Sequence, residues 1–258
     1  MTTKQITLIS SQSSKLGGYD LETTPYQKLK KDLEQFLIYQ LSINESITIH
    51  TGAAAGIEQL WGLAAVVIKK KYPSRVKIII HINHPDQIND LYKNNEKVNW
   101  NMIYNNSELK YVYNKNHKIE LQHNPELKNK IIAKELDAKY KNMINHSDIV
   151  LSLYDGTFGS TDKNINIAKS SNKEIVNIDP LKYFEATMAT SIVFLNDDLQ
   201  PKSFKEYTYT VNKNYNIGDI LEIQSNDNKS VVVKVTKTLK IPKNSAKSLK
   251  PLIVLKER

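Results

Sequence analysis

The chain has 258 residues, a hydrophobic content of 40% and a formal net charge of +9. This length suits one large domain, or a medium domain and a small one. The absence of cysteine excludes disulfides and thiolate metal sites. No apolar run approaches the roughly 18 residues of a membrane-spanning helix, and the N-terminus has no signal-peptide core. We therefore expect a cytoplasmic protein without membrane contact.

The positive charge is concentrated near the C-terminus. Residues 201–258 hold twelve Lys and Arg against five Asp and Glu. Only Arg75 and Arg258 are arginine, so bidentate arginine clamps on phosphate are scarce. The basic segment therefore needs its own electrostatic interpretation.

Strand and helix patterns alternate over the first 180 residues. In chain order they predict strands at 6–9, 46–50, 76–82, 149–154 and 174–178, and helices at 26–42, 57–71, 126–144 and 162–171. This order predicts an α/β fold, a Rossmann-like three-layer domain with a mostly parallel sheet. Residues 100–125 lack a clear period and are expected to form an extended, partly mobile insertion, in which 111–113 could be an extra strand.

The hydrophobic period changes to two after Pro201. Short strands are expected at 207–211, 217–223, 231–235 and 252–255. They predict a small C-terminal antiparallel β-barrel of SH3 or OB size, with about 55 residues. The predicted domains are therefore 1–198 and 201–258.

Two turns rich in small residues carry the functional prediction. The turn from Thr51 to Glu58 joins a strand to a helix, and the turn at 155–161 follows another strand. Small residues let the backbone approach a phosphate, and free amides of a first helical turn point at it. Each turn could instead be structural, as a tight connection at 51–58 and as an exposed turn with a helix N-cap at 155–161.

These segments belong to an ordered set of motifs. The set includes Lys15-Leu16-Gly17-Gly18-Tyr19, residues 51–61, Asn83-His84-Pro85-Asp86-Gln87, and residues 143–148 running into 155–161. Over roughly residues 5–180 the chain resembles the SLOG superfamily, and within it the YspA/YpsA-like branch. Other members are the lysine decarboxylase-like LOG phosphoribohydrolases and the Rossmann domain of DNA-processing protein A.

The resemblance implies a Rossmann-like fold that binds nucleotide-derived molecules at the carboxyl ends of its strands, in agreement with the general rule for open α/β sheets. Related domains sense nucleotide signals, often in bacterial defence, or hydrolyse N-glycosidic bonds. It also implies a cytoplasmic setting in a bacterial cell or a phage-infected host, and self-association, since SLOG-like domains commonly pair.

Two departures from the family favour binding over turnover. A Thr-Gly-His-Arg-Pro-like segment is common in this branch, and here Ile9, Ser10, Ser11, Gln12 and Ser13 stand in its place. The LOG hydrolases also have a glutamate where this chain has Asn164. An amide cannot replace a carboxylate in stabilising oxocarbenium charge or orienting water.

We therefore expect binding of a nucleotide-derived signalling molecule, by sensing or sequestration, in phage–bacteria conflict. The predicted contacts are Ser10, Ser11, Gln12, Tyr19, Gly52, Ala53, Ala54, Gly56, Glu58, Asn83, Asp155, Gly156, Thr157, Gly159, Ser160 and Thr161. The alternative is an N-glycosidic-bond hydrolase or transferase in which Glu58 or Asp155 is the catalytic carboxylate. Glu58 also suits the first turn of a helix electrostatically, whether or not it binds a ligand.

Two further possibilities concern metals and nucleic acid. The six histidines show no metal-ligand spacing, so neither a metal site nor a cofactor is predicted. The barrel could bind nucleic acid through its lysines, which are Lys213, Lys229, Lys234, Lys237, Lys240, Lys243, Lys247 and Lys250. The aromatics suited to base stacking cluster at its start, at Tyr207, Tyr209 and Tyr215. A solubilising or protein-docking role for the barrel fits equally well.

Overall fold

The computed structural model describes residues 2–157, 159–203, 205–225, 227–247 and 249–257. The chain forms two compact units. The first comprises Met1–Ser13, Tyr19–Leu153 and Lys163–Ile178, and the second comprises Ser14–Gly18, Tyr154–Asp162 and Asp179–Arg258.

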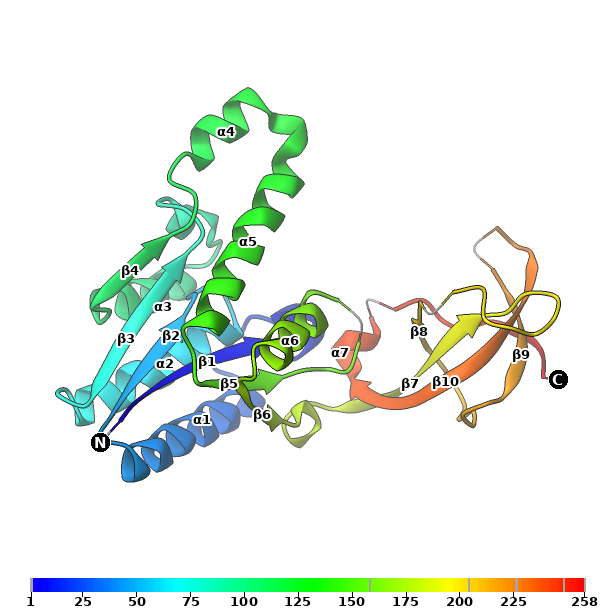
Figure 1. The fold of residues 1–258 in the computed structure, drawn as a ribbon, viewed down its shortest axis with the longest axis horizontal. Helices are drawn as coiled ribbons and strands as arrows, with labels where there is room; N and C mark the ends of the chain where they lie inside the picture. The colour runs from blue at the N-terminus through cyan, green and yellow to red at the C-terminus, as the bar shows by residue number, and fades with distance from the viewer. Residues whose placement is uncertain (1, 158, 204, 226, 248, 258) are drawn as a thin grey trace. The chain divides into compact units, whose positions relative to one another are not determined.

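The first unit is built on a six-stranded sheet with the order β4-β3-β2-β1-β5-β6 (Figure 1). All of its described ladders are parallel. The strands are β1 (Thr3–Ser10), β2 (Ser46–Thr51), β3 (Val76–Ile82), β4 (Leu109–Val112), β5 (Ile149–Leu153) and β6 (Glu174–Ile178). The predicted α/β class and parallel sheet are therefore confirmed.

Helices cover both faces of this sheet. They are α1 (Thr24–Ile43), α2 (Ile57–Lys71), α3 (Asn94–Asn105), α4 (His117–His123), α5 (Lys128–Asn145) and α6 (Ser160–Ser170). Short 3₁₀ turns lie at Ser13–Lys15, Gln87–Asp90, Pro125–Leu127 and Pro180–Lys182. On one face α1 packs against α2 and α2 against α3, while α5 and α6 lie on the other (Figure 1).

Helical spacing of apolar residues explains how these helices bury one side. In α1, Leu29, Leu33, Leu37 and Leu41 recur every four residues and are at most 4% exposed. Such a stripe faces the core, while the lysines between its members face solvent. On the opposite face of the sheet, Ile144 of α5 and Ala168 of α6 pack with Ile9 and Val150 of the strands. The sheet is thus buried on both faces, as parallel sheets require.

Residues 100–125 do not form the extended insertion that the sequence predicted. They contain the second half of α3, the edge strand β4 and the whole of α4. Within α3 only Trp100 and Ile103 are buried apolar residues, so the helical period was too weak to recognise. The proposed extra strand at 111–113 does exist in part, because β4 pairs in parallel with β3 and places Tyr111 opposite His81.

The second unit contains a five-stranded antiparallel sheet with the order β11-β9-β10-β7-β8. Its strands are β7 (Ala186–Phe194), β8 (Tyr207–Thr210), β9 (Ile220–Gln224), β10 (Ser230–Pro242) and β11 (Val254–Glu257), and a short helix, α7 (Lys243–Ala246), follows β10. The predicted antiparallel sheet is confirmed. Closure into a barrel is not found, since no described ladder joins β8 to β11, although an isolated bridge links Thr210 and Pro251.

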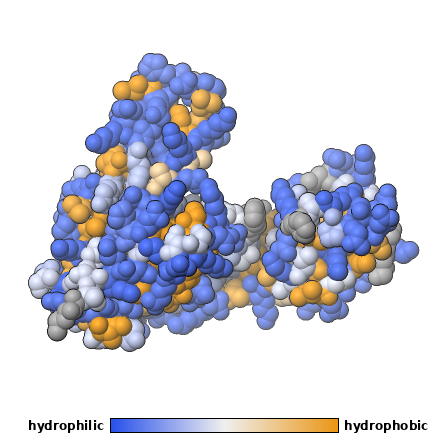
Figure 2. Space-filling model, in the orientation of Figure 1, coloured by the Kyte–Doolittle hydropathy of each residue, from blue (hydrophilic) through white to orange (hydrophobic). Residues whose placement is uncertain are grey.

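Polar residues dominate the face of the molecule shown in Figure 2. On the face shown in Figure 2, hydrophobic residues are scattered among hydrophilic ones. Several of the exposed hydrophobic side chains are tyrosines, such as Tyr92 and Tyr39. Among the described residues, no helix combines the length and the apolar character needed to cross a membrane.

Candidate functional site

The order of the strands marks one edge of the parallel sheet as the candidate site. The chain runs outward from β1 to β4 on one side and then returns to β5 and β6 on the other side of β1. Just beyond the strand ends, the Ser11 amide donates to the Leu153 carbonyl at 2.9 Å. In open α/β sheets, ligands bind beyond the carboxyl ends of the strands at such a reversal.

The loop between β2 and α2 has the tight backbone that its small residues predicted. Ala53 has φ +53° and Gly56 has φ +87°. A Cβ at Gly56 would lie 1.9 Å from Ser13 Oγ, so this position requires glycine. The Ala53 amide donates to Thr51 Oγ1 at 3.4 Å. The loop therefore depends on glycine at a point of close approach to the segment after β1.

Glu58 lies at the centre of a buried polar cluster beneath this loop. Its carboxylate accepts hydrogen bonds from Lys139 Nζ at 2.9 and 3.0 Å, from the Ala54 amide at 3.1 Å and from the Tyr140 hydroxyl. Lys139 is 0% exposed and Glu58 is 8% exposed. A Cβ at Gly52 would lie 2.1 Å from Glu58 Oε2. The backbone at Gly52 therefore packs directly on the carboxylate.

The charge state of this cluster follows from its partners. Burial favours the neutral carboxyl, but Lys139 and the donated hydrogen bonds outweigh burial and hold the pKa of Glu58 below its usual value. Burial and the neighbouring carboxylate raise the pKa of Tyr140 well above its usual value. Glu58 is thus an ionised acceptor whose hydrogen-bonding capacity is used within the protein. This arrangement gives it a positioning role, while its predicted contact with a ribose or a reacting bond stays a prediction.

The segment after β1 forms a hydrogen bond with the end of the β2–α2 loop. Ser11 and Ser13 are 2% and 6% exposed, whereas Gln12 is exposed and Tyr19 is 44% exposed. Ser13 Oγ accepts a hydrogen bond from the Ile57 amide at 3.0 Å, which occupies one free donor of the first turn of α2. Ser13 was not among the predicted contacts, so the structure adds it to the site.

The segment after β3 is connected to the same loop. The backbone amide of Asn83 donates to Gln87 Oε1 at 2.7 Å. The side-chain Nε2 of Gln87 in turn donates to the backbone carbonyl of Gly52 at 3.1 Å. Asn83 Oδ1 is buried without a hydrogen-bond partner among the described residues. The structure therefore links Asn83 to the β2–α2 loop through Gln87, which belongs to the motif at 83–87 but was not among the predicted contacts. The ligand contact predicted for Asn83 stays a prediction.

The second predicted turn, residues 155–161, belongs to the second unit. Asp155 is 4% exposed and accepts hydrogen bonds from Thr157 Oγ1 at 2.9 Å and from Ser245 Oγ at 2.8 Å. Lys15 Nζ donates to Thr157 Oγ1 at 2.9 Å. Gly156 has φ +80°. Asp155 and Thr157 thus belong to a local hydrogen-bonded network, and a ligand role for them stays a prediction.

The remaining predicted residues of this turn lie at the start of α6. The helix begins at Ser160, which is exposed, followed by Thr161, which is 8% exposed. A Cβ at Gly159 would meet no atom within 4 Å. Asn164, which stands where the LOG hydrolases have glutamate, is 4% exposed in the same helix.

A chain of neutral polar groups crosses the sheet behind the site. Because the Gln5 side-chain carbonyl can only accept, His50 Nε2 donates to it at 2.9 Å, and His50 Nδ1 is then free to accept from His81 Nε2 at 2.9 Å. The Tyr113 hydroxyl completes the chain by donating to His81 Nδ1 at 2.7 Å.

Burial is the largest cause that lowers the pKa of both histidines. Burial and the neighbouring His146 lower the pKa of His50 to about 4. Burial, His50 and Lys139 lower the pKa of His81 to about 2. A proton added to either ring would turn an acceptor in the chain into a second donor. We therefore assign both rings as neutral at physiological pH.

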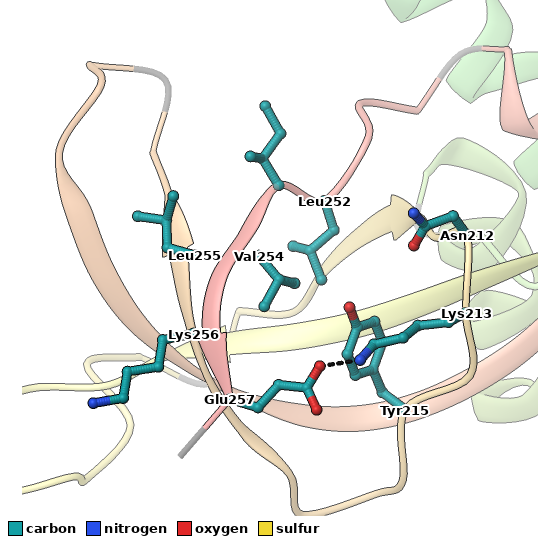
Figure 3. Close-up of a pocket in the computed structure, with 9 residues that line it drawn as sticks. Asn212, Lys213, Tyr215, Leu252, Val254, Leu255, Lys256 and Glu257 are labelled. Carbon is teal, nitrogen blue, oxygen red and sulfur yellow. Dashed lines mark hydrogen bonds and ion pairs between the residues drawn. The ribbon is translucent and has the colours of Figure 1, made fainter.

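The second unit has a pocket of about 580 Å³ between β11 and the loop after β8 (Figure 3). Asn212, Lys213 and Tyr215 face residues 252–257 across it. Lys213 and Glu257 form an ion pair on its wall, which neutralises both charges there. The pocket therefore has no net attraction for an anion from this pair.

Some of the groups proposed for nucleic-acid binding are engaged in other contacts. Lys213, Lys237 and Lys243 pair with Glu257, Glu206 and Glu185. Tyr215 is 6% exposed in the core of the antiparallel sheet, and Tyr207 and Tyr209 pack against that core. Base stacking needs exposed aromatic faces. These tyrosines therefore give the nucleic-acid alternative no structural support, and it stays a prediction from charge.

Lys139 and Tyr140 were not among the residues predicted from the sequence, although a signal for Lys139 was present. Glu135, Lys139 and Met143 follow one another at intervals of four in α5, and all three are buried. They therefore lie on one side of the helix. Charged residues on the buried side of a helix need partners, so this pattern predicts buried polar contacts from α5. Comparison with family models and with curated proteins found no match to this chain.

Proposed function

We propose that this chain binds a nucleotide-derived, phosphate-bearing small molecule at the carboxyl edge of its parallel sheet without turning it over. The observation that carries the proposal is the β2–α2 loop at the carboxyl end of β2, next to the strand β1 from which the order reverses. Glu58 and Lys139 hold this loop in place. A preorganised loop at a helix N-terminus is the usual setting for phosphate binding in α/β proteins.

The free donors of this loop support an anionic ligand. The amides of Ala54 and Ile57 have internal acceptors, whereas those of Ala55 and Gly56 have none among the described residues. Both lie immediately before α2, whose macrodipole favours negative charge at this end. A phosphate oxygen on these two amides would complete their hydrogen bonding.

The absence of turnover is supported by the engagement of the nearby carboxylate. Glu58 already accepts from Lys139, Tyr140 and the Ala54 amide, so it would have to give up a partner to act on a substrate. Asn164 also lacks the carboxylate that the LOG hydrolases use. A ligand contact from 155–161 rests on the resemblance and on chain order alone.

The biological role follows from the resemblance to the SLOG superfamily. Domains of that kind that bind without hydrolysis sense or sequester nucleotide signals, and the YspA/YpsA-like branch is common in phages and Gram-positive bacteria. We infer the same class of role here, in a phage-infected or bacterial cytoplasm, with self-association of the chain as a further expectation.

The test is to incubate the purified chain with nucleoside monophosphates and cyclic ADP-ribose-like compounds, and to identify by mass spectrometry what denaturation releases. We expect intact ligand. Free base that accumulates in proportion to protein would establish N-glycosidic cleavage instead and would overturn the proposal.

A matched pair of variants locates the binding site. Ala55→Asp places a negative charge beside the free amides and should abolish binding, whereas Ala55→Ser adds a polar group without charge and should retain it. Equal binding by both variants would exclude this loop as the anion site.

A further inference from the structure

Three potential metal ligands from separate segments meet in the first unit. His84 follows β3, His117 is the first residue of α4, and Glu135 lies in α5. The ligand atoms that they offer all lie within 4.8 Å of one another. The residues are 4%, 8% and 4% exposed, respectively. Intervals of 33 and 18 residues match no short metal-binding motif, so sequence spacing could not reveal the cluster.

The hydrogen bonds of His84 leave its Nδ1 nitrogen without a partner among the described residues. Its Nε2 lies 2.8 Å from Asp90 Oδ2, and because a carboxylate accepts, Nε2 carries the proton. In the neutral ring Nδ1 is then a lone-pair acceptor, and it is buried without a partner among the described residues. A buried acceptor of this kind requires a donor or a cation.

Glu135 presents a second buried acceptor in the same place. Its Oε1 accepts from His117 Nδ1 at 2.6 Å and from Asn114 Nδ2 at 2.7 Å. Its Oε2 is buried and has no partner among the described residues. Two buried acceptor atoms without hydrogen-bond donors, His84 Nδ1 and Glu135 Oε2, therefore lie in the same cluster. The low exposure of both residues nearly excludes water from it.

The surroundings supply the outer contacts that metal ligands normally have. A metal-binding histidine usually donates its other ring N–H to a carboxylate, and a ligating carboxylate is itself hydrogen-bonded. Asp90 has the first of these relations to His84, and Asn114 has the second to Glu135. These contacts fix the tautomer of His84 and the orientation of the carboxylate.

We propose that His84, His117 and Glu135 bind a divalent transition-metal ion of the Zn²⁺ class. Two imidazoles and one carboxylate form a common three-ligand set for Zn²⁺, with a fourth position for water or another ligand. Imidazole nitrogens disfavour Mg²⁺ and Ca²⁺, which take oxygen ligands. The ion would join the segment after β3 to α4 and α5.

Metal binding requires one change in the cluster. The rings of His84 and His117 are stacked, with centroids 3.8 Å apart and planes at 6°. A metal lies close to the plane of each imidazole that binds it, so parallel rings cannot share one ion. The His117 ring turns out of the stack, and its hydrogen bond to Glu135 is replaced by coordination.

The experiment uses the full chain after treatment with a chelator and dialysis. Zn²⁺ binding is measured by isothermal titration calorimetry, and Co²⁺ binding by the visible absorption of the bound ion. We expect one ion per chain and a rise in melting temperature with Zn²⁺. Failure of the wild-type chain to bind either ion at 1:1 stoichiometry would overturn the proposal without recourse to any variant.

Variants assign the ligands. His84→Gln and Glu135→Gln should each weaken Zn²⁺ binding at least tenfold and abolish the Co²⁺ absorption. His123→Gln is the matched control, because His123 is exposed and lies in the same helix as His117. This variant should bind the ion with the affinity of the wild-type chain. Unchanged affinity in both ligand variants, with their folding confirmed by circular dichroism, would disprove the assignment. Because the ions alone are the probe, the result does not depend on the nucleotide site.

Discussion

The Lys139 ammonium donates hydrogen bonds to both carboxylate oxygens of Glu58, at 2.9 and 3.0 Å, and neither side chain is more than one-tenth exposed. The two residues are 81 positions apart in the chain. Their ion pair connects α5 to the first turn of α2. It also fixes the loop at which we place the ligand. The stability of the fold and the shape of the site therefore depend on the same ion pair.

Breaking this pair from one side should be costly. Glu58→Gln leaves the ammonium of Lys139 buried without a counter-charge, and removal of one partner of a buried pair costs about 3–5 kcal/mol. Urea denaturation measures the loss. The double variant Glu58→Gln/Lys139→Met should recover part of it.

The matched control for that experiment is an exposed ion pair in the same unit. Lys163 and Asp137 lie 2.7 Å apart with side chains that are 57% and 58% exposed. Lys163→Met should change stability by about 1 kcal/mol or less. Equal losses for Glu58→Gln and Lys163→Met would contradict the structural role assigned to the buried pair.

Gly56→Ala should destabilise the chain by at least about 2 kcal/mol, through backbone strain and a steric clash. Gly56 has φ 87° and ψ −126°, and the added Cβ would lie 1.9 Å from Ser13 Oγ. Gly159→Ala is the comparison, because a Cβ there meets nothing within 4 Å and its φ lies outside the left-handed range. Thermal denaturation of the two variants should give clearly different melting temperatures.

Ser13→Ala tests the hydrogen bond between the segment after β1 and the first turn of α2. Its hydroxyl accepts from the Ile57 amide at 3.0 Å, and loss of a capping acceptor costs about 0.5–2 kcal/mol. The neighbouring Ser14 is exposed, so Ser14→Ala should be close to neutral. A neutral Ser13→Ala would mean that water replaces the hydroxyl at the start of the helix.

The buried histidines predict a loss of stability in mild acid. The pKa is lowered to about 4 for His50 and to about 2 for His81, while both rings titrate near 6.5 in the unfolded chain. The unfolded state therefore binds more protons below pH 6.5. The stabilising effect is complete above that pH, and it falls by about 1.4 kcal/mol per pH unit for each histidine as the pH decreases.

Urea denaturation between pH 7.5 and pH 5 measures this effect. Two histidines lower the free energy of unfolding by about 4 kcal/mol over the 1.5 units below pH 6.5. His81→Gln should make the decline shallower, while His123→Gln, at an exposed position, should leave the slope unchanged. A wild-type profile that is flat over this range would show that the histidine rings are protonated in the folded chain.

Most of the parallel sheet could be predicted from the sequence because its strands are short buried apolar runs. The predicted strand at 174–178 coincides with β6, and β2 and β3 lie within one residue of their predicted bounds. The helix at 126–144 corresponds to α5 with its start two residues later. Burial on both faces makes such strands uniformly apolar, and that signal is strong in a single sequence.

The antiparallel sheet was harder to predict because its alternation is interrupted. The strand β10 runs from Ser230 to Pro242, whereas only 231–235 was expected. A register shift between Val235 and Lys237 breaks the period of two in the middle of this strand. The strand β7 was missed altogether, and its five consecutive buried residues include small and polar side chains such as Ala189, Thr190 and Ser191.

Within the candidate site, only the position of one turn in the fold could be predicted, because local sequence determines it. The turn at 52–56 is encoded by adjacent residues, and the structure confirms its position between β2 and α2. Lys139, Gln87 and the His84–His117–Glu135 cluster reach their partners across long intervals of chain. Their roles depend on which strands and helices become neighbours, and a single sequence does not specify that directly.

The position of β1 has a consequence for how the molecule folds. Its partner β2 is close in the chain, but its other partner, β5, begins 139 residues after β1 ends. Residues 3–112 can thus assemble four adjacent strands by themselves, whereas β5 must close a long loop, which slows its addition. During refolding, amide protons in β2 and β3 should gain protection from exchange before those in β5 and β6.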